Sequence, residues 1–325
     1  MKINKYIIIF NCIIYLYFLF YKHENLRDYN NKINREISIN RNKINSDTNT
    51  LNLEIYPEDN VSSIPTAYIQ DNVTLVSAFY IIKSKHPLYY YIVKLNNLFQ
   101  LNASIVFFTE KAFMKIAKNL RPKNLYYKTV FIELEIIDFL SYKNYGSKFK
   151  ETFKLDFQNK FQTIPLYIIW AEKCNFLRKA IISNYFNSKC FYWIDSGWFR
   201  KNEEINRFIN GWPSPNKCYS DNRVLINLVG NFSPIEIKKI KQFNIKALKK
   251  LIGIINVASG MFGGQKPNLI KFIELYYRAI YKFEENNLFI GKEQNIFAYI
   301  SFLHPEVVKL INSSGDYFYF KKYLE

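Results

Sequence analysis

The sequence predicts an α/β fold with a mainly parallel sheet and helices on both faces. From residue 73 onward, short runs rich in β-branched and aromatic residues alternate with segments of helical spacing. This alternation is typical of parallel strands joined by crossover helices. The chain is also long enough for such a domain to bury a complete core. The β-rich runs are Val73–Ile82, Ser104–Thr109 and Thr129–Leu134, and the helical segments are roughly 87–100 and 110–120.

The expected elements follow in chain order. Thr109 is placed to cap the second helix. An amphipathic helix over 165–186 leads directly into the next strand. Ser233 and Glu236 form a capping box with proline between them, which predicts a lysine-rich helix ending near Leu251. The last expected elements are a strand or loop at Val257–Gly264 and helices over about 267–286 and Glu293–Leu303.

The segment Phe191–Gly197 is the strongest candidate for a site. Four apolar residues end at Asp195, Ser196 and Gly197, which predicts a buried strand that releases an aspartate into a tight turn. Ligands of open α/β sheets bind at the carboxyl ends of strands. An aspartate there can hold a divalent cation that binds phosphate, and a glycine lets backbone approach a ligand. The alternative is an ordinary solvated turn, which these residue types also favour.

Further candidates surround this turn. Ser77 and Tyr80 end the first expected strand, where they could border a nucleoside, although aromatic residues there also pack cores. Arg178 precedes the Asp195 strand and Arg200 follows it. Their guanidinium groups suit a diphosphate, and the alternative is an ordinary surface arginine.

A last group of candidate residues could contact a second substrate that acts as an acceptor. Gly260, Gly263 and Gly264 form a loop small enough to admit a ligand, unless they only make a turn. Glu293 and Gln294 place an acid and an amide at a helix start. As a site, Glu293 offers an acceptor-binding or a catalytic carboxylate, and the alternative is an ordinary helix cap.

The amino-terminal region predicts a membrane anchor. Residues 6–21 are almost entirely apolar, lysines flank them, and no small residues offer a cleavage site. Residues 1–21 are therefore expected to be a cytoplasmic tail and uncleaved transmembrane signal anchor, with a buried amino-terminal helix as the alternative. Residues 22–72 are polar and predict a flexible stem. The globular domain, 73–325, is expected to be lumenal or extracellular, in a single-pass type II arrangement.

The charge of the chain favours anionic partners. The net charge is +18, and residues 22–72 hold six basic and eight acidic residues, so the excess lies in the globular part. A basic domain suits a nucleotide, a phosphorylated glycan or a membrane surface, and the alternative is scattered solvated lysines. The sequence contains no zinc-finger or RNP pattern, so no nucleic-acid partner is expected.

The cysteine and asparagine positions limit the possible disulfides and zinc sites, and the number of sequons slightly favours a lumenal domain. Outside the expected anchor the cysteines are Cys174, Cys190 and Cys218, which allow at most one bridge within the chain. The sequence has no CxxC pair and three histidines, so no structural zinc site is expected. Five glycosylation sequons begin at Asn60, Asn72, Asn102, Asn231 and Asn312.

Six segments of the chain carry a family resemblance: VTLVSAFY, SIVFFTE, WAEKCNFLRKA, FYWIDSGWFR, VASGMFGG and GKEQNIF. In this order they resemble the HtrL/YibB family over nearly all of residues 73–305. Members of that family are associated with cell-surface polysaccharide assembly and look like GT-A glycosyltransferases. The resemblance implies a GT-A-like, Rossmann-type sheet that carries a nucleotide-sugar beside an acidic, metal-holding motif.

The resemblance also assigns roles to residues. It implies that Asp195 holds Mn²⁺ or Mg²⁺ at the diphosphate and that Glu293 and Gln294 lie near the acceptor. The usual GT-A motif is Asp-any-Asp, whereas Ser196 and Gly197 follow Asp195 here. Glu293 or His304 could supply a second ligand if the carboxyl-terminal helix folds back over the sheet end.

The function expected is transfer of a sugar from a nucleoside diphosphate sugar to a glycan or glycoprotein acceptor. A non-catalytic glycan-binding or glycan-assembly protein with the same fold is the first alternative, favoured by the missing second carboxylate. A metal-dependent hydrolase using Asp195 is the other, and the lack of a cluster rich in histidine or carboxylate counts against it.

Overall fold

The computed structural model describes residues 71–156, 158–252 and 257–325, which belong to one compact unit. The expected anchor over 1–21 lies outside the described residues, as does nearly all of the expected stem. Within the described ranges, no helix has the length and apolarity needed to cross a bilayer.

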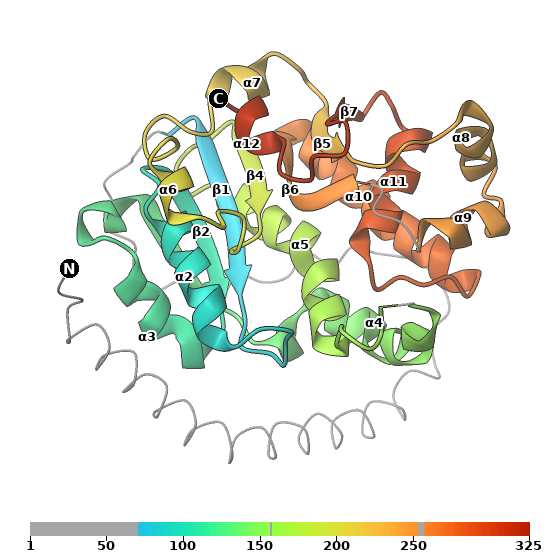
Figure 1. The fold of residues 1–325 in the computed structure, drawn as a ribbon, viewed down its shortest axis with the longest axis horizontal. Coiled ribbons are helices and arrows are strands. Elements are labelled where there is room, and N and C mark those ends of the chain that lie inside the picture. Colours follow the sequence, from blue (N-terminus) through green and yellow to red (C-terminus); the bar gives the residue numbers. More distant parts are fainter. Residues whose placement is uncertain (1–70, 157, 253–256) are drawn as a thin grey trace. The chain divides into compact units, whose positions relative to one another are not determined.

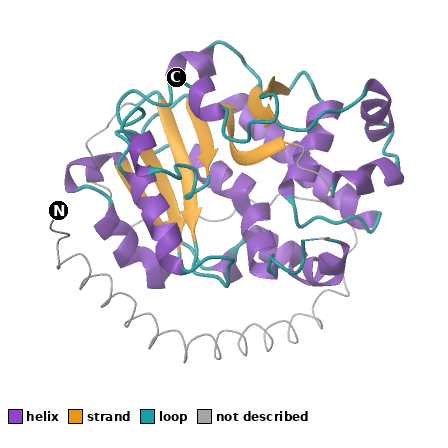
Figure 2. Ribbon diagram, viewed as in Figure 1, coloured by secondary structure: helices purple, strands orange, loops and turns teal. Residues whose placement is uncertain are grey.

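Seven strands form one mixed sheet in the order β3-β2-β1-β4-β6-β5-β7 (Figure 2). Neighbouring strands are parallel, except that β6 is antiparallel to both β4 and β5. The prediction of a mainly parallel sheet is therefore confirmed. The strands are β1 (Val73–Phe79), β2 (Ser104–Thr109), β3 (Thr129–Glu133), β4 (Cys190–Ile194), β5 (Val224–Leu228), β6 (Val257–Gln265) and β7 (Val308–Asn312).

Helices cover both faces of the sheet, as the sequence predicts (Figure 1). Alternate residues of β1 belong to different apolar clusters: Leu75 packs with residues of α2 and α3, and Val76 packs with residues of α5, α10 and α11. The helices are α2 (Leu88–Phe99), α3 (Lys111–Leu120), α4 (Leu140–Thr152), α5 (Ile164–Ser183), α6 (Asn202–Ile205), α7 (Pro215–Tyr219), α8 (Pro234–Lys241), α9 (Ile245–Leu251), α10 (Lys266–Glu285), α11 (Glu293–Leu303) and α12 (Phe320–Tyr323), with short 3₁₀ turns at Lys123–Lys128, Ile136–Asp138 and Phe153–Leu155.

The start of α3 differs from the prediction. Thr109 does not cap this helix, because its hydroxyl donates to the Phe79 carbonyl of the neighbouring strand at 2.7 Å. The N-cap residue is Glu110, without a capping side-chain bond. The Glu135 carboxylate instead accepts from the first helical amide, that of Lys111, at 2.9 Å. Thr109 therefore belongs to the end of β2, where it bonds to β1, although its spacing predicted that it would cap the helix.

The lysine-rich segment forms two helices rather than the single one expected. The capping box is confirmed, since the Glu236 amide donates to the Ser233 hydroxyl and the Ser233 amide to the Glu236 carboxylate. The first helix, α8, ends at Lys241, and Phe243 then adopts a φ of +54°. The Asn244 side chain caps α9 by accepting from the Ala247 amide at 3.0 Å. Phe243 in the left-handed conformation, followed by the Asn244 cap, divides the segment into two helices.

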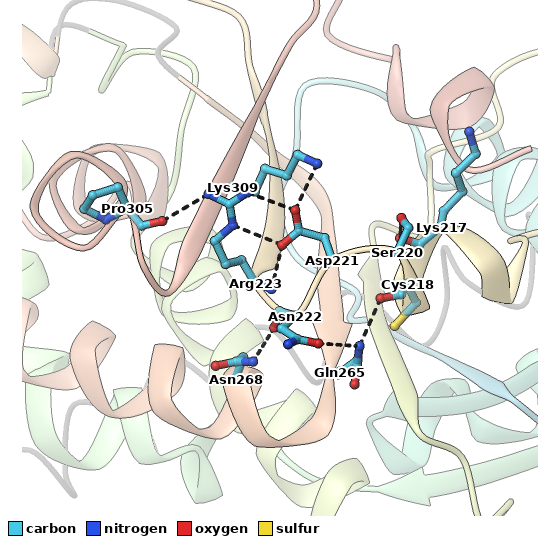
Figure 3. Close-up of polar contacts among 10 residues, drawn as sticks. All are labelled: Lys217, Cys218, Ser220, Asp221, Asn222, Arg223, Gln265, Asn268, Pro305 and Lys309. Carbon is cyan, nitrogen blue, oxygen red and sulfur yellow. Dashed lines mark hydrogen bonds and ion pairs between the residues drawn. The ribbon is translucent and has the colours of Figure 1, made fainter.

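Ion pairs link the amino ends of β5 and β7 (Figure 3). The Asp221 carboxylate lies 2.9 Å from both the Arg223 guanidinium and the Lys309 ammonium. Near them, a disulfide joins Cys190, the first residue of β4, to Cys218 in α7. The sequence left the pairing open and allowed one bridge, and among the described cysteines there is one, with Cys174 buried and unpaired.

Candidate functional site

A pocket of about 210 Å³ opens at the carboxyl edge of the sheet, beside the turn that follows β4. This is the place that the strand ending at Asp195 predicts. The helices α5 and α11, the start of β6 and the segment before α12 also contribute. Its lining residues are Gln158, Trp170, Lys173, Asp195, Ser259, Lys292, Glu293, Gln294 and Tyr317.

The antiparallel strand β6 brings the Ser259 region to this edge. Ile194 pairs with Met261, and the Asp195 amide donates to the Gly260 carbonyl at 2.8 Å. A Cβ atom on Gly260 would lie 2.6 Å from the Trp198 ring and 3.0 Å from Asp195 Oδ2. Glycine is therefore required here because the strand, the aspartate and the tryptophan pack against one another.

Lys173 lies between two carboxylates at the centre of the site. Its Nζ is 3.0 Å from Asp195 Oδ1 and 2.7 Å from Glu293 Oε1. The Ser259 hydroxyl donates to the same Glu293 oxygen at 2.8 Å, and the Trp193 indole donates to Asp195 Oδ1 at 2.8 Å. The side chain of Asp195 is 38% exposed, whereas those of Lys173 and Glu293 are 3% exposed. Asp195 is thus the member of this cluster that can reach a ligand.

The two buried members of the cluster have altered pKa values. Burial alone would lower the pKa of Lys173, but the charges of Asp195 and Glu293 outweigh it and raise that pKa above its ordinary value. Burial raises the pKa of Glu293, and the Lys173 charge opposes this only in part. The lysine is therefore held charged and keeps Asp195 beside a fixed cation.

A second ion pair forms the wall next to this cluster. The Lys292 ammonium lies 2.7 Å from Asp156 Oδ1 and 3.0 Å from the Gln158 side-chain oxygen. The Tyr167 hydroxyl donates to the other Asp156 oxygen at 2.5 Å. Burial and this bond to Asp156 raise the pKa of Tyr167, so it remains a neutral donor. These contacts hold in place the wall of the pocket that contains Gln158 and Lys292.

The residues around Asp195 do not fit a divalent metal held by the protein itself. Its Oδ1 already accepts from Lys173 and Trp193. The described part of the chain has no group of three or more His, Cys, Asp or Glu residues that could hold a metal ion. Of the two expected second ligands, Glu293 is bound by Lys173, and His304 pairs with Glu306 at 3.0 Å. No step below is routed through a metal, and Mn²⁺ or Mg²⁺ stays a prediction.

Two of the residues expected at the nucleoside are inside the core. Ser77 is fully buried in β1, and Tyr80 is 4% exposed, with its ring 5.0 Å from that of Phe139 and 6.2 Å from that of Phe176. Neither lines the pocket. Their hydroxyl groups have no hydrogen-bond partner.

The expected phosphate-binding residues lie apart from the pocket lining. Arg178 is five residues beyond Lys173 on α5, which places it about 7.5 Å further along the helix and on a different face. Arg200 is exposed, and its guanidinium lies 4.6 Å from the Phe318 ring centroid. Gly197 faces Lys94 of α2, because a Cβ there would lie 3.7 Å from Lys94 Cδ. The Asp195 turn therefore connects the pocket to a basic region at α2.

The residues expected near the acceptor divide into two groups. Glu293 and Gln294 line the pocket, and their contact with an acceptor stays a prediction. Gly263 and Gly264 lie inside β6, where a Cβ would meet the Phe191 carbonyl at 2.2 Å and the Arg223 carbonyl at 3.0 Å. The sheet thus provides its own reason for these glycines, and their contact with an acceptor stays a prediction.

Several lining residues were not among the expected site residues. Trp170 and Lys173 are three residues apart on α5 and so share a face, a spacing that could have identified them. Ser259 directly precedes the expected glycines. Lys292 and Tyr317 had no comparable signal, since each reaches the pocket only through contacts with distant parts of the chain.

Comparison with known proteins supports the resemblance found in the sequence. A family model described as "Bacterial protein of unknown function (HtrL_YibB)" matches residues 71–324. No curated protein matches the chain. The match spans the whole described sheet and every residue of the pocket. The chain therefore belongs to the HtrL/YibB family.

Proposed function

We propose that the protein is a GT-A-like glycosyltransferase, which moves a sugar from a nucleoside diphosphate sugar to a glycan or glycoprotein acceptor. One observation carries this proposal. A small pocket at the ligand-binding edge of the sheet combines a partly exposed carboxylate, Asp195, with two aromatic side chains, Trp170 and Tyr317. A sugar ring has apolar C–H faces that suit aromatic rings and hydroxyl groups that suit carboxylates and amides.

The size of the pocket agrees with a single sugar unit. Sites for drug-sized ligands have volumes of about 300–1,000 Å³, and this pocket has about 210 Å³. Its polar lining supplies both donors and acceptors, among them Gln158, Ser259 and Gln294. A polyhydroxylated ring could be oriented by these groups with few of its hydroxyl groups left unpaired.

The proposed reaction has simple roles for the carboxylates. The bond from the anomeric carbon to the diphosphate oxygen breaks, and the nucleoside diphosphate leaves with the electron pair. An acceptor hydroxyl oxygen bonds to that carbon and gives its proton to a carboxylate. The bonds of Asp195 to Lys173 and Trp193 use Oδ1, so Oδ2 is the oxygen proposed to accept this proton. Glu293, buried and held by Lys173 and Ser259, is proposed to fix the position of the lysine beside Asp195.

A non-catalytic glycan-binding or glycan-assembly protein is the second candidate. The observation that favours it is the pairing of Lys173 with both carboxylates. The ion pair keeps one oxygen of Asp195 engaged with a buried lysine, which suits binding better than proton transfer. This candidate retains the sugar pocket but has no turnover.

We also propose the membrane-anchored, lumenal or extracellular location expected from the sequence. The Cys190–Cys218 disulfide supports it, since disulfides form and persist in oxidising compartments. Four of the sequon asparagines, Asn72, Asn102, Asn231 and Asn312, have exposed side chains that glycosylation could reach.

A nucleotide-sugar screen tests the proposal. Thermal shift and turnover would be measured with a panel of nucleoside diphosphate sugars, with Mn²⁺ and with EDTA. We expect Asp195→Asn to abolish turnover while the melting temperature changes by only a few degrees, since a partly exposed residue costs about 1 kcal/mol or less. Asp138→Asn is the matched control, because this acid is 53% exposed and pairs only with Lys143.

The outcomes separate the candidates. Stabilisation by a free glycan without turnover of any nucleotide sugar would favour the binding protein. Full activity of Asp195→Asn would contradict the role given to this carboxylate. Binding of the nucleotide that is equally strong with EDTA would remove Mn²⁺ and Mg²⁺ from consideration, whereas mutual enhancement would establish one of them as a cofactor.

A further inference from the structure

Lys94 is a buried cation without a carboxylate partner. It lies on α2 with 7% of its surface exposed, and its Nζ is 3.0 Å from the Tyr90 ring centroid. Four lysines are buried in the described part of the chain, and the other three each form an ion pair with a carboxylate: Lys173, Lys292 and Lys321. Lys94 forms none with any described residue.

Such an arrangement is costly in a protein that has no ligand bound. A buried charge that lacks a counter-ion loses its hydration without compensation. A cation–π contact with one tyrosine ring returns only part of that loss. The position is therefore better suited to a state in which an anion from outside the chain lies beside the ammonium group.

The surroundings of Lys94 are also positively charged. The nearby positive charges of Lys94, Arg200 and Lys85 lower the pKa of the Tyr90 hydroxyl. Lys85 and Arg200 are exposed, so they can move toward a ligand. Lys85 and Arg200 therefore add positive charge near the Lys94 ammonium and the Tyr90 hydroxyl.

The cluster is attached to the turn that carries Asp195. The Asn97 side chain of α2 donates to the Phe199 carbonyl at 3.2 Å, which holds the helix against the turn. A Cβ on Gly197 would lie 3.7 Å from Lys94 Cδ, so the glycine leaves this side of Lys94 without a covering side chain. One residue, Ser196, separates Gly197 from Asp195, whose side chain lines the pocket. A ligand lying across this turn could occupy both places.

We infer that Lys85, Tyr90, Lys94 and Arg200 form a binding site for the phosphate groups of an organic phosphate. Lysine supplies a point charge, arginine supplies a planar pair of donors, and tyrosine supplies a hydroxyl donor. The inference rests on the proposed function only for the identity of the ligand, which would then be the nucleoside diphosphate part of the donor. A phosphorylated glycan presents the same chemistry, and the experiment distinguishes the two.

Calorimetry with inorganic pyrophosphate is the direct test. The full-length protein, kept in a nonionic detergent, would be titrated as wild type and as Lys94→Met, Arg200→Gln and Lys246→Met. We expect Lys94→Met to lose at least about tenfold in affinity and Arg200→Gln to lose less, since bonds to a charged group are worth about 1.5–3 kcal/mol. Lys246→Met is the matched control, because this exposed lysine lies on α9 and its removal changes the net charge equally.

The melting temperature of Lys94→Met is a second test, because replacing a lysine with only a structural role should lower it. Without pyrophosphate, Lys94→Met should have a higher melting temperature than the wild type, because methionine fills the same space without an unpaired charge. An unchanged pyrophosphate affinity, or a lower melting temperature in Lys94→Met, would overturn the inference. Failure of that variant to fold would count as a lower stability and would overturn the inference as well, whereas a folded Lys94→Met with weaker pyrophosphate binding and a higher melting temperature would support it.

The same titrations identify the ligand. Tighter binding of a nucleoside diphosphate than of pyrophosphate, lost in Lys94→Met, would support the donor. Tighter binding of a sugar phosphate would support a phosphorylated glycan. If pyrophosphate binds through Lys94 and no nucleotide sugar is turned over, the phosphate site stands and the proposed transfer does not. If nucleotide sugars are turned over equally by Lys94→Met, the transfer stands and the phosphate site does not.

Discussion

The two edges of the sheet use charged residues in different ways. At the amino edge, Asp221 is shared by Arg223 and Lys309, and all three are partly open to solvent (Figure 3). At the carboxyl edge, Lys173 and Glu293 are almost completely buried, and Lys94 is buried without an acid. The Asp221 group keeps its charges where water still screens them, whereas the Lys173 group removes them from water. Arg121, at the amino ends of β2 and β3, is also buried, but its guanidinium donates to three backbone carbonyls.

This difference indicates which edge is adapted to a ligand. Paired charges at the rim of a fold connect loops at little cost. Buried charges cost free energy that hydrophobic residues of the same size would not, so they persist where a site requires them. The amino edge also contains the disulfide, which adds stability but no reactive group. Mutations at the two edges should therefore have different consequences.

The largest expected loss of stability follows removal of the central lysine. Lys173→Met leaves Glu293 buried without its counter-ion and removes the cation beside Asp195. Breaking a buried pair by removing one partner costs about 3–5 kcal/mol. Urea unfolding at pH 7 measures the change. The double variant Lys173→Met/Glu293→Gln is the control and should recover part of the loss, and a change below about 1 kcal/mol in the single variant would contradict the pairing.

Reduction of the disulfide should have the next largest effect. Cys190 and Cys218 are 28 residues apart, and closing a loop of this size stabilises a protein by about 2–4 kcal/mol. The Cys190→Ser/Cys218→Ser variant should lose this amount in urea unfolding, and the wild type in dithiothreitol should lose the same. The variant should still bind its ligand, because the bridge lies at the amino edge. Loss of ligand binding at a retained fold would contradict the separation of the two edges.

At the carboxyl edge, stability should fall as the pH rises. Burial and, to a smaller extent, the charge of Glu135 raise the pKa of Glu110 to about 7. A raised folded-state pKa means that the folded protein binds this proton more tightly than the unfolded chain. The contribution of Glu110 is therefore complete below about pH 4.5 and is lost as the pH rises through about 7.

Unfolding free energies between pH 5 and pH 8 would measure this effect. We expect the wild type to lose about 1–3 kcal/mol over that range, and Glu110→Gln to lose less. Glu133→Gln is the control, because this exposed acid ends the adjacent strand. Equal pH dependence in wild type and Glu110→Gln would show that another group is responsible.

Local patterns predicted much of this fold. The bounds of β2 and the strand that ends before Asp195 follow directly from runs of apolar residues. Local patterns were less reliable where contacts with other parts of the chain set the conformation. Thr109 bonds to β1 instead of capping a helix. Phe243 interrupts the single helix expected between Ser233 and Leu251. Strands β5 and β7 were not predicted, because short segments at the far side of a sheet have no distinctive spacing.

The candidate site could be predicted only in part. Asp195, Glu293 and Gln294 stand at the ends or starts of elements, where local sequence places them correctly. Their partner Lys173 is 120 residues from Glu293, and no periodicity records a contact over that distance. The unpaired state of Lys94 likewise depends on which acids the fold brings near α2. Burial and pairing are properties of the packed chain, so they appear only in the structure.

The smallest expected effect lies at the amino edge and has the opposite pH dependence. The bonds from Arg223, together with Lys309, hold the pKa of Asp221 well below its usual range, although partial burial opposes them. A depressed folded-state pKa contributes stability above the unfolded value of about 4, and this contribution is lost as the pH falls. Asp221→Asn should cost about 1 kcal/mol at pH 7, as expected for a partly exposed network. The difference from wild type should shrink progressively as the pH falls from about 4 toward the low folded-state pKa.

Unfolding free energies of the wild type and Asp221→Asn, measured at pH 7 and in acid, test this prediction. Asp138→Asn is the control, because the pair of Asp138 with Lys143 is about half exposed and should contribute almost nothing. A cost of 3 kcal/mol or more would show that charges at the amino edge are desolvated as strongly as those at the carboxyl edge. The contrast between the edges would then reflect the position of the ligand pocket alone, and burial of charge would no longer point to a binding site at α2.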